Sequence, residues 1–329
     1  NQTKTVVVPL LYRILNANLG LRDLSNAEAV AHFATRENVP LELRVEAMRI
    51  LRTWDKPSGR DRLIGLWRPL PSRPQSVAAT AMRAHLGGIF NGPDRLRKEA
   101  ARVAAHLGIK QVGPALLKLL KDTERPASSR VAMLRALTQL KDQRLPEAIE
   151  IGLKDAEPLV RHEARRALAL RSPGKAGAML RSILNEGDKL PGKVTAERQR
   201  EADQIAKQGA FAILGKLKTR SAEELLTDWM EKLIAKKVAP ELQLDVLEAA
   251  SASPFKTVKA KVTQYENAKP KNDHLAKYRE SLQGGNAERG RQIFLYKNAV
   301  SCLRCHAVQD LGGEVGPNLS DVGLRQKRE

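Results

Sequence analysis

The sequence predicts an all-α protein, in which a stack of helix pairs precedes a small C-terminal module of another kind. Hydrophobic residues make up 42% of the 329 residues but aromatic residues only 4%, which favours helices packed through small aliphatic side chains over a β-sandwich. A helical pattern recurs along the first 250 residues. Two cysteines followed directly by a histidine stand near the C-terminus, where that pattern has ended.

Six segments share one pattern, in which a basic or amide residue is followed three positions later by a small apolar residue and then by Leu or a similar residue. The pattern is centred on Ala47, Ala100, Met133, Ala164, Ala210 and Val246. Successive centres are 53, 33, 31, 46 and 36 residues apart, or about 40 on average. A variable period of this size indicates stacked helix pairs joined by loops of different lengths.

The clearest unit runs from Asp155 to Arg171. Its apolar residues fall at helical spacing on one stripe: Val160, Ala164, Ala167 and Leu168. The charged residues between them lie off that stripe: Arg161, Glu163, Arg165 and Arg166. Pro158 suits the first turn of this helix, and Ser172-Pro173-Gly174 ends it. One pair alone could not bury such a stripe, so neighbouring pairs have to stack.

This unit resembles the second helix of a HEAT repeat. The resemblance rests on Asp155, Pro158, Val160 and Arg161, followed by Ala164 and Leu168. It implies a HEAT-like α-solenoid, and it implies that Asp155 and Arg161 form hydrogen bonds between adjacent repeats. In the other segments the pattern is degenerate, because Ala47 and Ala100 have the arginine without the Asp-x-x-Pro. An irregular helical bundle remains the alternative.

A different segment begins at Gly284-Gly285, after the helical pattern fades. Within it, Cys302, Cys305 and His306 form the C-x-x-C-H arrangement of c-type haem attachment. Positions i, i+3 and i+4 share one face of a helical turn, so two thiols can bind one porphyrin while the next imidazole reaches its iron. We therefore predict covalently attached haem c, with His306 as the proximal iron ligand.

Three other interpretations of the cysteine pair remain open. A zinc site needs about four ligands, and the chain has no second C-x-x-C and no H-x₃₋₅-H segment. A thioredoxin-like redox pair is expected where a strand leads into a helix, which an all-helical setting does not offer. The third interpretation is a chance match. The presence of both cysteines of the chain in the motif argues against it.

The residues around the motif resemble a class I cytochrome c. Residues 286–300 look like its amphipathic first helix, with Gly290 and Phe294 on the face that meets the C-terminal helix in that family. Residues 316–319, Gly-Pro-Asn-Leu, resemble the family's G-P-x-L segment, whose proline carbonyl accepts a hydrogen bond from the proximal imidazole. The resemblance therefore implies that Pro317 orients His306 and increases its basicity as a ligand.

HEAT-like repeats that end in such a module resemble a family of haem-binding proteins of planctomycetes and verrucomicrobia. The resemblance implies HEAT-like repeats in residues 1–254, a linker or last helix in 255–283, and the N-terminal part of a cytochrome c domain in 284–329. In cytochromes c the distal Met or His lies further downstream, and no Met follows Met230 in this chain. We therefore expect the sequence to be a fragment, cut at both ends, with an incomplete haem module.

These features predict electron transfer through the haem, with a redox partner protein or a fused dehydrogenase domain supplying the electrons. Covalent haem attachment takes place outside the cytoplasmic membrane, so a periplasmic or otherwise exported location is expected. The sequence contains no Ser/His/Asp set, phosphate loop or paired carboxylates, and it does not support an enzyme assignment for this chain by itself. No apolar run is long enough to span a bilayer.

The net charge of +20 supports an alternative function. In that alternative the chain is a non-catalytic HEAT-repeat scaffold that binds a polyanion or a protein and whose haem motif is unoccupied. Helical-repeat DNA glycosylases show that such arrays can hold DNA. The scarcity of aromatic side chains for base stacking and the dispersal of the basic residues argue against nucleic acid as the partner.

Overall fold

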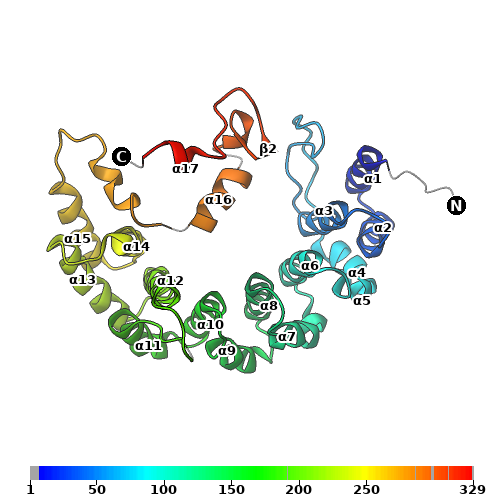
Figure 1. The fold of residues 1–329 in the computed structure, drawn as a ribbon. Helices are drawn as coiled ribbons and strands as arrows, with labels where there is room; N and C mark the ends of the chain where they lie inside the picture. Colours follow the sequence, from blue (N-terminus) through cyan, green and yellow to red (C-terminus); the bar gives the residue numbers. More distant parts are fainter. Residues whose placement is uncertain (1–6, 191, 286, 298–299, 310, 328–329) are drawn as a thin grey trace. The chain divides into compact units, whose positions relative to one another are not determined.

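The computed structural model of the chain describes residues 7–190, 192–285, 287–297, 300–309 and 311–327. It is mostly helical, which confirms the predicted all-α class (Figure 1). The chain divides into two compact units, Asn1–Arg171 and Ser172–Glu329, which we call unit 1 and unit 2. Among the described residues, no helix has both the length and the apolar character that crossing a membrane requires.

Unit 1 is built from successive antiparallel helices (Figure 1). They are α1 (Val8–Leu21), α2 (Leu24–Thr35), α3 (Leu41–Arg52), α4 (Gln75–Ala84), α5 (Leu86–Phe90), α6 (Asp94–His106), the 3₁₀ turn η1 (Lys110–Val112), α7 (Gly113–Lys121), α8 (Ala127–Leu140), α9 (Leu145–Leu153) and α10 (Pro158–Arg171). Helices α3, α6, α8 and α10 pack against one another in sequence order. Each of these four also packs against a neighbour in a second layer: α2, α5, α7 and α9 respectively.

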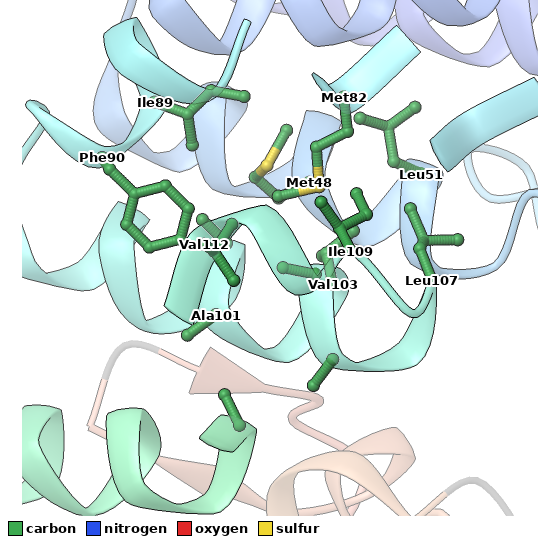
Figure 2. Packing of buried hydrophobic residues seen from close by; sticks show 14 of the residues in the cluster. Met48, Leu51, Met82, Ile89, Phe90, Ala101, Val103, Leu107, Ile109 and Val112 are labelled. Atoms are coloured by element: carbon green, nitrogen blue, oxygen red, sulfur yellow. The ribbon is translucent and has the colours of Figure 1, made fainter. Parts of the chain in front are cut away.

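The core of unit 1 lies between these layers and consists of aliphatic, Met and Ala side chains. Figure 2 shows Met48 and Leu51 of α3 beside Met82 of α4, with Phe90 and Val103 close by. Alanines on the repeat stripes, such as Ala100 and Ala164, are fully buried and let the helix backbones approach closely. The apolar residues that the sequence places at helical spacing are therefore the residues that fill the core.

One arginine in each repeat of unit 1 binds the backbone that precedes its own helix. These arginines stand three residues before the repeat centres: Arg44, Arg97, Arg130 and Arg161. Arg44 Nε donates to the Ala34 carbonyl at 2.8 Å, and Arg97 Nε donates to the Phe90 carbonyl at 2.8 Å. Each guanidinium thus satisfies carbonyl groups that a helix end or loop leaves without a partner.

The clearest repeat also contains an ion pair between neighbouring helix pairs. Asp155, in the loop before α10, forms an almost fully buried ion pair with Arg130 of α8. Arg161 donates to the Asp155 carbonyl at 2.6 Å and to the Ala156 carbonyl at 2.9 Å. Three of the charged residues that lie off the apolar stripe of α10 are buried as well: Arg161, Glu163 and Arg165. The Arg166 side chain reaches solvent.

Unit 2 continues with longer helices and ends in a small mixed segment. Its elements are α11 (Pro173–Glu186), α12 (Ala196–Leu214), α13 (Arg220–Ile234), α14 (Pro240–Ala252), α15 (Lys256–Asn267), the 3₁₀ helix η2 (Ala276–Ser281), α16 (Ala287–Tyr296), the 3₁₀ turn η3 (Cys302–Arg304), β1 (Ala307–Val308), β2 (Leu311–Gly312) and α17 (Val322–Arg325). Helix α14 packs against α12, α13 and α15, and η2 lies against α14.

The segment between the last long helices and the C-terminal module is held by a buried polar cluster. Glu280 of η2 accepts a hydrogen bond from the Tyr265 hydroxyl at 2.6 Å and pairs with Lys269 Nζ at 2.9 Å. Burial and the adjacent carboxylate raise the pKa of the Tyr265 hydroxyl, while the bonds from Tyr265 and Lys269 outweigh burial and lower the pKa of Glu280. This cluster joins the end of α15 to η2.

Candidate functional site

The predicted site residues Cys302, Cys305 and His306 lie in one tight turn. Ser301 has a left-handed conformation (φ 47°) and leads into η3. The Cys305 and His306 amides both donate to the Cys302 carbonyl, at 3.3 and 3.1 Å. Both cysteines are free thiols; Cys305 is exposed and Cys302 is partly so. The turn therefore brings two accessible thiols and an imidazole into five consecutive residues.

The chain after His306 folds back over this turn. Strands β1 and β2 pair antiparallel, with Ala307 opposite Gly312. The Gly313 amide then donates to the Leu303 carbonyl at 2.8 Å, and the Leu319 amide donates to the Ala307 carbonyl at 2.8 Å. Backbone hydrogen bonds on both sides of His306 thus fix the returning loop, residues 313–319, against the turn.

His306 and Pro317, which are eleven residues apart, meet in this fold. The distance between His306 Nδ1 and the Pro317 carbonyl oxygen is 2.9 Å. A carbonyl oxygen can only accept a hydrogen bond, so Nδ1 must carry the proton. In the neutral imidazole the other nitrogen, Nε2, then has a free lone pair and is the atom that can bind a metal.

Three glycines allow the returning chain to approach the backbone of the turn and the His306 ring closely. A Cβ at Gly316 would lie 2.8 Å from His306 Cε1, and a Cβ at Gly313 would lie 2.3 Å from the Arg304 carbonyl oxygen. Gly312 has φ +112°, a conformation that other residues rarely adopt. Sequence reasoning did not assign a role to Gly312 and Gly313. The Gly-Gly pair between the cysteine motif and residues 316–319 was the signal that could have identified them.

Side chains after the loop hold the Pro317 segment in place. Arg325 Nη2 of α17 donates to the Asn318 carbonyl at 2.8 Å, and Asn318 Oδ1 accepts from the Ser320 amide at 2.8 Å. The Ser320 hydroxyl oxygen accepts from the Gln309 amide at 2.7 Å. These bonds limit the movement of the Pro317 carbonyl, which accepts the hydrogen bond from His306 Nδ1.

An apolar cavity of about 560 Å³ lies beside the turn. Gly290 and Phe294 of α16 form one wall, and Val308, Leu319 and Val322 are among the residues that form the other. Cys302, Cys305 and His306 do not line it. Gly290 and Phe294, which the sequence places on a packing face, therefore face an apolar space that the described part of the chain leaves unfilled.

No protein-family model matches the chain, and no curated protein sequence matches it. Among the residues that the structure describes, no three His, Cys, Asp or Glu side chains are grouped so that they could hold a metal ion.

The donor set of Cys302, Cys305 and His306 suits a c-type haem. Two thiols are available for thioether bonds, and one imidazole has its Nδ1 proton engaged and its Nε2 free. The absence of a Cβ at Gly316 leaves the ring room in the orientation that Pro317 imposes. The residues present therefore fit the group that the C-x-x-C-H spacing predicts.

Proposed function

We propose that the chain is an electron-transfer protein, in which a C-terminal cytochrome c-like module carries covalently attached haem. The observation that carries the proposal is the hydrogen bond from His306 Nδ1 to the Pro317 carbonyl at 2.9 Å. A histidine that binds a metal generally donates its other ring N–H to such an acceptor, which fixes the tautomer and the ring plane. The C-x-x-C-H spacing alone does not require this contact.

The residues of the site have separate tasks in this proposal. The Cys302 and Cys305 thiols hold the porphyrin through thioether bonds, and His306 Nε2 binds its iron. Pro317 keeps the His306 proton on Nδ1 and increases the electron density at Nε2. When bound, the haem supplies an iron centre that accepts and releases one electron at a time.

We propose further that the helix pairs form a HEAT-like α-solenoid that supports this module. The repeated bonds from Arg44 and Arg97 to preceding carbonyls, and the Arg130–Asp155 pair between neighbouring helix pairs, support this assignment. A redox partner protein or a fused dehydrogenase domain then supplies the electrons, and the chain works in the periplasm or another exported location.

The experiment is expression of the full chain in a host with working cytochrome c maturation machinery, next to a Cys302→Ala/Cys305→Ala variant. Haem is then measured by the visible spectrum of the denatured protein and by intact mass. We expect the unmodified chain to retain one haem after denaturation and the variant to retain none. A colourless protein at its bare mass would instead favour the alternative, a binding scaffold with an unoccupied motif.

A further inference from the structure

A row of arginines runs along one layer of unit 1. The residue two positions after each repeat centre is arginine in all four repeats of this unit; we call Arg49, Arg102, Arg135 and Arg166 the arginine row. They belong to α3, α6, α8 and α10, which pack against one another in that order (Figure 1). In unit 2 the equivalent residues are Ala212 and Glu248. The row is thus a property of unit 1 and not of the repeat pattern itself.

The side chains of the arginine row reach solvent, with exposed fractions between 36% and 57%. Packed helices lie about 8–10 Å apart, so equivalent positions on neighbouring helices repeat at about that distance. The four positions of the row are therefore expected at a regular spacing along the layer.

Two buried carboxylates beneath the row, Glu99 and Glu163, hold three of its four arginines in position. Glu99 pairs with Arg102 of its own helix at 3.0 Å and with Arg52 of α3 at 3.1 Å. Glu163 pairs with Arg135 of α8 at 2.7 Å and also with Arg166 of its own helix. Each carboxylate thus holds two guanidinium groups, and an excess of positive charge remains at the surface.

The arginine row retains hydrogen-bond donors for a ligand. Arg102 engages Glu99 through Nη1, and Arg135 engages Glu163 through Nε. Within the described part of the chain, the other guanidinium nitrogens of these two arginines have no partner. These donors form the planar fork that binds a carboxylate with two parallel hydrogen bonds.

A groove of about 290 Å³ lies at the centre of the row, between α6 and α8. Arg52, Arg102 and Arg135 line its rim. Its floor includes the small apolar side chains Ala105, Ala132 and Ala136. The groove therefore combines a cationic rim with an apolar floor that can accept a small side chain.

We propose that this groove and the arginine row bind an acidic segment of a partner protein. On an α-helix, residues i and i+7 lie on one face about 10.5 Å apart, close to the expected spacing of the row. Carboxylates at these positions would meet successive arginines, and a small apolar side chain between them would rest on the alanine floor. The proposal does not depend on haem binding, because it concerns residues of unit 1 only.

The groove is poorly suited to nucleic acid. None of the residues that line it is Phe, Tyr or Trp, so it offers no large aromatic ring on which a base can stack. Glu99 and Glu163 already neutralise part of the charge of the row, which weakens its attraction for a dense phosphate backbone. A protein segment with spaced carboxylates matches the remaining charge better.

The test uses the full chain and two fluorescein-labelled helical peptides. One carries Glu at every seventh position and the other carries Gln at those positions. In the chain, Arg102→Gln/Arg135→Gln removes two members of the row while Glu99 keeps Arg52 and Glu163 keeps Arg166, so neither buried carboxylate is left unpaired. We expect this variant to bind the Glu peptide at least about tenfold more weakly by fluorescence anisotropy.

A matched control separates the row from net charge. Arg83 of α4 and Lys118 of α7 are exposed and do not line the groove, so Arg83→Gln/Lys118→Gln removes the same charge elsewhere in unit 1. We expect this variant to bind the Glu peptide like the unmodified chain. Equal losses in the two variants, or equal binding of the Glu and Gln peptides, would overturn the proposal. Tighter, row-dependent binding of a single-stranded oligonucleotide of equal charge would overturn it in favour of nucleic acid.

Discussion

Asp245 occupies in α14 the repeat position that Glu163 occupies in α10, one residue before the repeat centre, but the two acids have opposite surroundings. Glu163 is fully buried between two arginines. Asp245 faces Gln208, and Glu248 stands where the first unit has an arginine. Burial raises the pKa of Asp245 to about 6; the Gln208 hydrogen bond partly opposes this and the Glu248 charge adds to it. The same position thus holds an ion pair in one unit and a protonatable acid in the other.

We predict that Asp245→Asn stabilises unit 2 at neutral pH. Because the pKa of Asp245 is raised in the folded state, its contribution to stability is fully present below pH 3.8 and is lost as the pH rises through about 6. The asparagine has no charge to desolvate, so the variant should gain about 1 kcal/mol at pH 7, after an allowance for solvent screening. Urea unfolding at pH 5 and pH 7.5 measures the difference. A gain that is the same at both pH values would contradict this prediction.

We predict that Asp155→Asn strongly destabilises unit 1. The Arg130 guanidinium would lose its carboxylate while remaining almost fully buried, which costs about 3–5 kcal/mol. The control is Glu147→Gln, which removes an exposed ion pair with Lys121 and should cost less than about 1 kcal/mol. Thermal unfolding followed by circular dichroism compares the two variants. Similar melting temperatures for both would show that the buried pair contributes no more than the exposed one.

The hydrogen bond to Pro317 predicts the tautomer of His306 before any haem is attached. In its neutral form the ring should carry its proton on Nδ1, because only a donor there can satisfy the Pro317 carbonyl at 2.9 Å. Long-range ¹H–¹⁵N correlation spectra of the imidazole distinguish the two tautomers. A ring with its proton on Nε2 would mean that the contact does not persist in solution.

We predict that Gly316→Ala lowers the yield of covalent haem, a prediction that rests on the proposed function. The new Cβ would lie 2.8 Å from His306 Cε1, so either the imidazole or the loop has to move. Gly323→Ala in α17 is the matched control, because a Cβ there would meet no atom within 4 Å. Haem per protein, measured after denaturation, should fall for Gly316→Ala and stay unchanged for Gly323→Ala.

Periodicity predicted the helices better than it predicted their contacts. The apolar spacing and Pro158 indicated a helix that the structure has as α10, Pro158–Arg171. The prediction that Ser172-Pro173-Gly174 ends a helix was correct, and Pro173 also begins α11. The burial of Glu163 and Arg130 could not be predicted, because each has an ion-pair partner 25 or more residues away in the sequence. The spacing of apolar residues within one helix does not show which residues of other helices will lie next to it.

In the candidate site, too, local spacing predicted some features, while others became visible only in the fold. The spacing of Cys302, Cys305 and His306 predicted that they share one turn, because helical geometry brings i, i+3 and i+4 together. The role of Pro317 came only from a family resemblance, since nothing in the ten residues between it and His306 shows that the chain folds back. The sequence has an arginine two residues after each of the first four repeat centres, but no role was predicted for these arginines. Their role depends on Glu99 and Glu163, whose ion pairs with neighbouring helices only the fold shows.

The buried acids Glu99 and Glu163 also affect how long a bound partner would remain on the arginine row. Arg102 and Arg135 are already paired with carboxylates of their own chain. A carboxylate of the partner would therefore share a guanidinium group and would not neutralise an unpaired one. Each new contact then changes the electrostatic energy only modestly. Such a surface suits short-lived complexes, whose lifetime falls further as the ionic strength rises.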